Sequence, residues 1–135
     1  STGRDTRRPM RRRLISGTSP YESVAGFSRA VVVGDRVHVA GTAPIPVDGS
    51  TPPDGAYEQA RLCLELIGAA LERAGSSLEH VVRTNIYVTD RAHWDEVARA
   101  HGEVFRDVRP AATCVVSDLL DPSWKVEIEA DAVIP

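Results

Sequence analysis

Hydrophobic and polar positions follow two different periods along the chain, which predicts a mixture of strands and helices. Residues 28–33 and 36–40 are rich in β-branched side chains, and the Gly34-Asp35 link between them predicts a hairpin. Apolar residues then recur at helical spacing over residues 56–74, and Gly75 follows as a helix stop. The remaining predicted elements are a strand over 81–89, a helix over 92–105, strands over 111–117 and 125–133, and a further short strand over 12–16.

The order of these elements, β-β-α-β-α-β-β, predicts an α+β fold in two layers, with one sheet and both helices on one of its faces. The opposite face lacks helical cover, and burial against other copies of the chain is the simplest way to cover it. We therefore expect a single domain over residues 14–135 that forms an oligomer. Gly41 ends the second predicted strand, where the absence of a side chain lets another group approach the backbone closely.

The net charge of −3 is unevenly distributed along the chain. Residues 1–13 hold six arginines and one aspartate, whereas the remaining 122 residues hold ten cations and eighteen anions. A basic arm of this kind could bind nucleic acid. The acidic remainder would repel phosphate, so we interpret residues 1–13 as a flexible, solvated arm and do not expect a nucleic-acid partner.

Composition and motifs exclude several classes of function. The longest uninterrupted apolar run covers only residues 30–33, so no membrane span is expected. Two cysteines give no disulfide framework and indicate a reducing, cytoplasmic setting, and the four histidines lack the spacing of metal ligands. Neither a phosphate-binding glycine loop nor a hydrolase nucleophile elbow is present.

The last predicted strand carries the most unusual polar pattern. Small and apolar residues occupy its even positions, while Glu127, Glu129 and Asp131 occupy odd ones, which places three carboxylates on one face. A solvated strand face explains this pattern equally well. If neighbouring copies cover the face, a partly desolvated carboxylate there gains proton affinity and could act as a general acid or base. Cys114 has no His or cationic partner adjacent in sequence, and Cys63 lies in the apolar stripe of the first predicted helix, so both are interpreted as packing residues.

Several segments in fixed order and spacing resemble the Rid family, the RidA/YjgF-like reactive-intermediate deaminases that are also labelled L-PSP endoribonucleases. The resemblance implies a chorismate-mutase-like sandwich, a homotrimer with small-molecule clefts between subunits, and chemistry without metal or cofactor. It rests on Gln59 and on residues 19–21 (Ser-Pro-Tyr), 39–44 (Val-Ala-Gly-Thr-Ala-Pro), 74–84, 87–90, 109–115 and 126–130 (Val-Glu-Ile-Glu-Ala).

The resemblance also implies a reaction and a set of site residues. Deaminases of this family hydrolyse enamine and imine intermediates, such as 2-aminoacrylate and its imine, to a 2-keto acid and ammonia. Matched motif by motif, the residue that activates water is Glu127. The matched substrate-binding residues are Tyr21, Gly41, Thr113 and Cys114.

One position departs from the family pattern. The arginine that binds the substrate carboxylate in the deaminases corresponds to Ala112, whose methyl group offers neither charge nor hydrogen bonds. Arg109 is no simple replacement, because positions 109 and 112 of a regular strand point to opposite faces. A pocket with Ala112 beside Glu127 is larger and net acidic, so we expect a neutral, cationic or bulkier ligand rather than 2-aminoacrylate.

Three interpretations of function follow from the sequence. The first is a cofactor-free deaminase or hydrolase that acts on a C=N bond in another substrate. The second is a non-catalytic trimer that binds a small molecule or has a regulatory role. The third is RNA binding or cleavage, which depends on the basic arm alone, because the chain lacks a pattern of aromatic stacking residues and its folded part is acidic.

Overall fold

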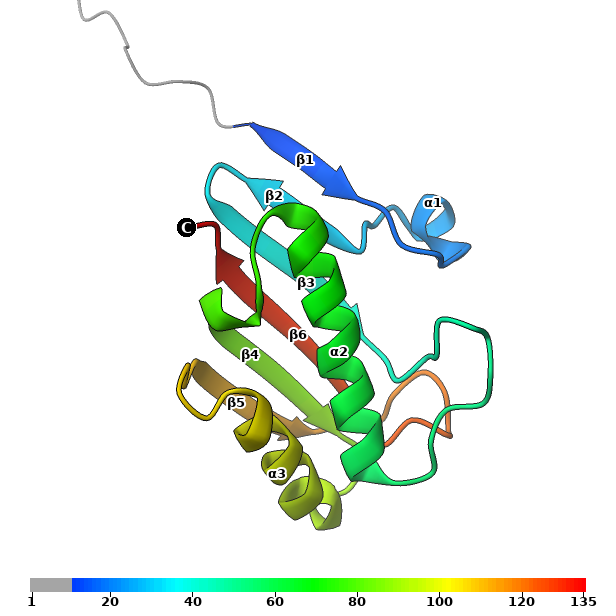
Figure 1. Ribbon diagram of the computed structural model, residues 1–135. Helices are drawn as coiled ribbons and strands as arrows, with labels where there is room; N and C mark the ends of the chain where they lie inside the picture. Colours follow the sequence, from blue (N-terminus) through cyan, green and yellow to red (C-terminus); the bar gives the residue numbers. More distant parts are fainter. Residues whose placement is uncertain (1–10) are drawn as a thin grey trace, which may run out of the picture.

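Six strands form one mixed sheet in the order β1-β2-β3-β6-β4-β5 in the computed structural model, which describes residues 11–135 (Figure 1). Strands β4 and β5 run parallel, and every other neighbouring pair is antiparallel. The predicted α+β class and mixed sheet are therefore confirmed. The strands are β1 (Arg12–Ile15), β2 (Ala30–Val33), β3 (Arg36–Thr42), β4 (Val81–Val88), β5 (Ala111–Val116) and β6 (Val126–Val133).

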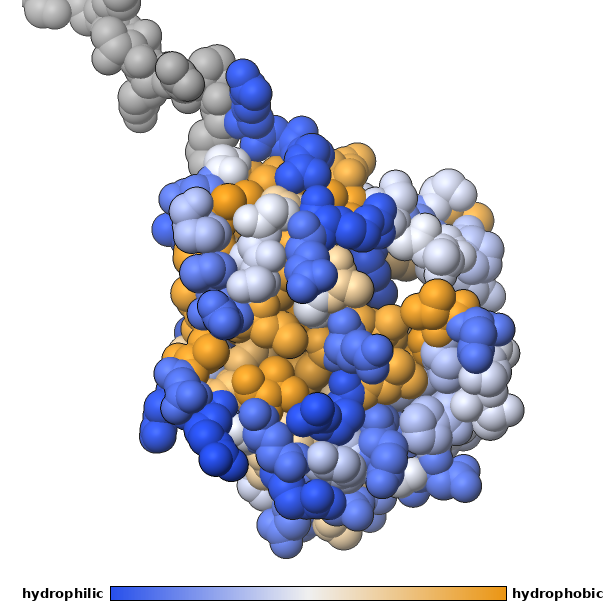
Figure 2. All heavy atoms as spheres, viewed as in Figure 1, coloured by the Kyte–Doolittle hydropathy of each residue, from blue (hydrophilic) through white to orange (hydrophobic). Residues whose placement is uncertain are grey.

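Two long helices, α2 (Ala56–Ala74) and α3 (Trp94–Val104), cover the same face of the sheet and lie in front of the strands in Figure 1. Helix α2 packs over β6, β3 and β2, and α3 packs beside α2. From this side, hydrophobic residues gather in the middle of the face, where α2 lies, and hydrophilic residues surround them (Figure 2). The short helices are α1 (Tyr21–Ala25), η1 (Leu78–His80) and η2 (Arg91–His93), of which α1 was not anticipated from the sequence.

The helical period of the sequence determines which side of α2 is buried. Its core-facing stripe includes Leu64, Ile67 and Leu71, all essentially inaccessible to solvent. Gly75 ends the helix with φ of 91°, a left-handed conformation that residues with a side chain rarely adopt, and its N–H bonds the carbonyl groups of the last turn. The predicted helix over 56–74 is confirmed at both ends.

Strand β6 lies between β3 and β4 and alternates as its sequence predicts. Val126, Ile128, Ala130 and Ala132 are buried on the helix-covered face. The intervening residues project from the opposite face, which neither α2 nor α3 covers. The row of carboxylates from Glu127 onward is therefore on the open face of the sheet.

The first strand begins inside the segment that we interpreted as an arm. Arg12 and Arg13 belong to β1, the edge strand paired with β2, and Arg13 Nη2 donates a hydrogen bond to the Ala74 carbonyl at 3.0 Å. These two residues are therefore part of the sheet. Residues 1–10 of the predicted arm lie outside the described residues. Among residues 11–135, no helix combines the length and apolar character that crossing a bilayer requires.

Gln59 on α2 holds two loops together by hydrogen bonds at one end of the sheet. Its side chain is 1% exposed, and its Nε2 donates to the carbonyls of Pro53 at 2.8 Å and Ser123 at 2.9 Å. Its Oε1 accepts a hydrogen bond from the Lys125 N–H at 2.7 Å. One side chain thus holds the loop that precedes α2 and the loop that leads into β6.

Replacing Gln59 with Leu is expected to lower the free energy of unfolding by about 2 kcal/mol, because three partly buried backbone groups lose their partner. Urea denaturation of the purified variant measures this loss. Glu65→Leu, at an exposed position of the same helix, is the matched control and should change stability by less than about 0.5 kcal/mol. Equal stability of the two variants would contradict the role assigned to Gln59.

Candidate functional site at the start of strand β6

Glu127 is the second residue of β6 and lies on the open face, opposite Tyr87 of β4 in the strand register. Its side chain is partly buried. This burial raises the pKa of the Glu127 carboxyl, Arg29 opposes the shift, and the like charge of Glu129 adds to it. A carboxyl group with a raised pKa takes up and releases protons more readily near neutral pH than an exposed one.

Gly41 lies directly against the Glu127 carboxylate because β3 bulges at this point. The β3–β6 register shifts between the pairs Val39–Ala130 and Thr42–Ile128, so that two residues of β3 oppose one residue of β6. A Cβ atom on Gly41 would overlap with Glu127 Oε2. The structure therefore brings together Gly41 and Glu127, two of the residues that the sequence analysis singled out.

Arg29 joins this pair, although the sequence analysis did not select it. Its Nη2 donates a hydrogen bond to the Gly41 carbonyl at 2.6 Å. Burial lowers the pKa of the Arg29 guanidinium, and the carboxylates of Glu22 and Glu127 partly reverse the shift. The only sequence signal was a single arginine at the start of the β-branched run over residues 28–33, which an ordinary strand end explains equally well.

The other two carboxylates of the row already have partners within residues 11–135. Glu129 Oε1 accepts hydrogen bonds from Asn85 Nδ2 at 3.0 Å and from the Tyr87 hydroxyl at 2.8 Å, and the second bond raises the pKa of Tyr87. Asp131 pairs with His38 Nδ1 at 2.7 Å. No hydrogen bond from residues 11–135 reaches the carboxylate of Glu127, which leaves it available to a water molecule or a ligand.

Tyr21 makes no hydrogen bond to Glu127 within residues 11–135. It begins α1, its side chain is 65% exposed, and its N–H is bound by Ser19 Oγ. A groove of about 550 Å³ runs between α1 and the open face of β1–β3, and Phe27 rather than Tyr21 contributes its aromatic ring to the lining. Phe27 is a second residue at this end of the molecule that the sequence analysis missed.

The β5 residues divide between the two faces of the sheet. Thr113 pairs with Asn85 and therefore shares the open face with Glu129. Ala112 and Cys114 pair with buried β4 residues and have the orientation of the helix-covered face, where Cys114 packs against the core. Burial raises the pKa of the Cys114 thiol, which fits a packing residue better than a nucleophile.

Cys63 lies fully buried on the core side of α2, as the sequence predicts for a packing residue. Burial raises the pKa of this thiol strongly, and the negative charge of Glu127 adds to the shift. Arg109 adopts a left-handed φ of 54° just before Pro110, and β5 begins only at Ala111. Arg109 thus lies outside the strand whose alternation we used to assess it.

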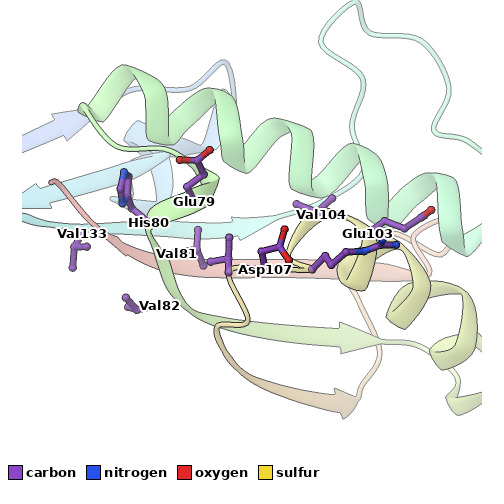
Figure 3. A pocket seen from close by; sticks show the side chains of 10 residues that line it. Glu79, His80, Val81, Val82, Glu103, Val104, Asp107 and Val133 are labelled. Atoms are coloured by element: carbon purple, nitrogen blue, oxygen red, sulfur yellow. The ribbon is translucent and has the colours of Figure 1, made fainter.

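A larger groove of about 840 Å³ lies at the opposite end of the sheet, where β4 begins and β6 ends (Figure 3). Glu79 and His80 project from one side of it, and Glu103 and Asp107 from the other. In residues 11–135, no three His, Cys, Asp or Glu side chains come close enough to hold a metal ion. Of the site residues predicted from the sequence, which all lie within residues 11–135, the structure brings Glu127 and Gly41 together, at the start of β6.

Comparison with known proteins agrees with this fold. Residues 17–134 match the family described as endoribonuclease L-PSP, and the chain belongs to this family. In the crystal structure of Rv2704 from Mycobacterium tuberculosis, a member of the YjgF/YER057c/UK114 family, the matched chain is 42% identical. The match covers 92% of this chain and 100% of that chain, with a TM-score of 0.83.

Curated relatives point the same way. The uncharacterized protein SCO2049 of Streptomyces coelicolor is 38% identical over 122 residues, 90% of each chain. The 2-iminobutanoate/2-iminopropanoate deaminase of Mus musculus is 29% identical over 90% of this chain and 91% of its own length. The resemblance to the Rid family is thus confirmed, and some members carry the name of imine deaminases.

The close approach of Glu127 to Gly41 predicts the effect of adding one methyl group. Gly41 does not have a positive φ, so only space limits substitution there. Gly41→Ala is expected to lower the free energy of unfolding by about 1 kcal/mol, because the end of the Glu127 side chain must move aside for the added methyl group. In a Glu127→Ala background the same change should cost less than about 0.5 kcal/mol, because the clashing carboxylate is gone.

Urea denaturation of the four proteins of this double-mutant cycle measures the coupling. Gly102→Ala in α3 is the matched control, because no atom lies within 4 Å of the added Cβ. It should leave stability unchanged or raise it by up to about 1 kcal/mol. A cost for Gly41→Ala that persists without the Glu127 carboxylate would show that the two residues do not meet.

The environment of Glu127 also predicts its titration. Its carboxyl should titrate above the ordinary value of 4.5 in a ¹³C NMR experiment. Arg29→Gln should raise this pKa further by removing a positive charge, and Glu129→Gln should lower it by removing a negative one. Since the folded state then holds the proton more tightly than the unfolded chain, this group lowers stability as the pH rises above 4.5. Shifts in the opposite directions would contradict the proposed environment.

Proposed function

We propose that the chain is a cofactor-free hydrolase that deaminates a small imine or enamine, with Glu127 as the residue that directs water. One observation carries the proposal: of the three carboxylates on β6, only Glu127 lacks a partner within residues 11–135, and it is partly buried beside Gly41 and Arg29. The deaminase name of the mouse relative supports the reaction class.

The reaction needs only a base that accepts a proton from water and returns it to the nitrogen of the substrate. Water hydrogen-bonded to the Glu127 carboxylate attacks the carbon of a C=N bond, and Glu127 takes up the proton that the water loses. Glu127 passes this proton to the nitrogen, which gives a neutral carbinolamine. Glu127 then takes the proton of the new hydroxyl group and returns it to the nitrogen as the C–N bond breaks, so that one imine and one water yield one carbonyl compound and one ammonia.

A homotrimer would complete the site. The open face of the sheet exposes Leu14 and Val115, Phe27 is exposed in the groove beside it, and a monomer would leave these apolar side chains in water. In the proposed trimer, neighbouring copies cover this face. Tyr21 and Thr113 of one copy then border the Glu127 cleft of another, with the small-molecule ligand between subunits. Ala112 and Cys114, whose side chains face the helices, would border this cleft through the backbone of β5. We propose a cytoplasmic location for this assembly.

Glu127→Gln tests the catalytic assignment. The variant should lose about 10²–10⁴-fold in the rate of ammonia release from imines that an amino-acid oxidase generates in situ, because the amide cannot accept a proton from water. Asp131→Asn, on the same strand and face, is the matched control and should stay within a few-fold of wild type.

Two outcomes would reject the proposed reaction. Equal turnover by Glu127→Gln and wild type would exclude Glu127 as the group that directs water. Binding of a small molecule without turnover, unchanged by Glu127→Gln, would instead support the alternative of a non-catalytic binding or regulatory trimer.

A further inference from the structure

We propose that Arg29 binds the carboxylate of the ligand at the Glu127 site, and hence that this site takes a monocarboxylate. The inference rests on the proposed function for the identity of the reacting end of that ligand. It assigns to Arg29 a binding role that position 112, an alanine, cannot supply.

Arg29 has donor groups to spare at this position. A guanidinium carries five N–H donors, and within residues 11–135 that of Arg29 makes one hydrogen bond, from Nη2 to the Gly41 carbonyl. Its Nε is buried and has no partner in the same residues. Most buried donors in proteins are paired, so a charged group left in this state calls for an explanation. An anion bound across the outer nitrogens would compensate the charge that burial has partly desolvated.

The guanidinium is also held in place before any ligand arrives. The stem of the side chain passes close to Gly17, where an added Cβ would lie 3.2 Å from Arg29 Cβ and 3.4 Å from its Cδ. The far end is fixed by the bond to the Gly41 carbonyl. A ligand therefore meets a pre-ordered group, and little rotamer freedom remains to be lost on binding.

Nearby carboxylates do not occupy the guanidinium. Glu22 and Glu127 lie close enough to influence the Arg29 charge, yet the only ion pair within residues 11–135 is that of His38 with Asp131. A carboxylate matches the planar donor pattern of a guanidinium and can bind it with two parallel hydrogen bonds. The two acidic neighbours disfavour a dianion such as phosphate, so a single carboxylate fits best.

Gly41 sets the spacing of the two ligand contacts. Arg29 binds its carbonyl, and Glu127 lies against its Cα, so both charged groups meet at the same residue of the β3 bulge. A bound molecule would place its carboxylate on Arg29 and its C=N group next to Glu127. This arrangement revises the sequence-based expectation of a net acidic pocket that disfavours anions.

Binding of a carboxylate and of its uncharged amide separates this proposal from a structural role. The probes are 2-oxobutanoate and 2-oxobutanamide, titrated calorimetrically into the full chain. Wild type should bind the acid at least about 10-fold more tightly than the amide. Arg29→Gln should weaken binding of the acid by about 10- to 100-fold and leave binding of the amide unchanged.

Three further variants make the test decisive. Arg29→Lys should recover part of the acid affinity, since an ammonium keeps the charge without the bidentate geometry. Arg36→Gln, an exposed arginine on β3, is the matched control and should leave both affinities unchanged. If Arg29→Gln does not fold, Arg29→Lys decides the question by the same ratio of acid to amide affinity. Gly17→Ala, whose added Cβ would clash with Glu22 Oε2 and also press on the stem of Arg29, should lower this ratio as well.

Several results would overturn the proposal. The first is that the wild-type protein binds 2-oxobutanoate and 2-oxobutanamide with equal affinity, and the second is that it binds neither. The third is that the Arg29 variants lose affinity for the acid and for the amide to the same extent. The proposed reaction fails separately: loss of turnover in Glu127→Gln with an unchanged acid-to-amide ratio in Arg29→Gln would retain the deaminase and reject the anchor. An Arg29-dependent ratio in a protein without turnover would retain the anchor alone.

Discussion

The contact between the Glu127 carboxylate and the bare Cα of Gly41 organises this end of the molecule. It exists because β3 gains one residue relative to β6, which turns the backbone of Gly41 toward the neighbouring strand. The same bulge presents the Gly41 carbonyl to Arg29. A carboxylate, a guanidinium and a backbone carbonyl therefore meet at one irregularity of the sheet, in a position where a side chain would contact the Glu127 carboxylate.

Packing on the helix-covered face of the sheet supports this arrangement. Small and branched residues of helix α2 pack against the buried face of β6. This packing holds the even-numbered residues of β6 in the core, so its odd-numbered residues point away from the helices. Two of the three outward carboxylates are engaged by Asn85, Tyr87 and His38. The difference between Glu127 and its two neighbours on the strand is thus a difference in partners rather than in residue type.

Much of this architecture could be predicted from the sequence. The hydrophobic periods identify all six strands and both long helices, and the alternation in β6 places Glu127 on the face opposite the core. These features depend on local spacing. The β3 bulge could not be predicted from local spacing. It arises only when β3 pairs with β6, and the sequence does not give the register between distant strands.

Arg29 and Tyr21 show the same limit of prediction from sequence: the sequence did not indicate the first, and it did not place the second in the fold. Arg29 carries no motif, and its importance follows from a contact with a carbonyl twelve residues away. Tyr21 was selected because it matched a family motif, but the fold places it on an exposed helical turn that sequence periodicity did not reveal. Ala112 and Thr113 are adjacent in sequence yet have opposite orientations on β5, so motif matching alone could not tell which of them shares the face of Glu127.

The hydrogen bonds from Gln59 to the two loops have a consequence for how the loop sequences can vary. All three of its hydrogen bonds are to main-chain atoms, the carbonyls of Pro53 and Ser123 and the N–H of Lys125. Among the loop side chains, Lys125 adds one bond between the loops, from Nζ to the Asp54 carbonyl, and Asp121 accepts two bonds from Ser123 within its own loop. Within residues 11–135, no other side chain of either loop is hydrogen-bonded to the opposite loop, so their identities can change while Gln59 keeps the two loops in place.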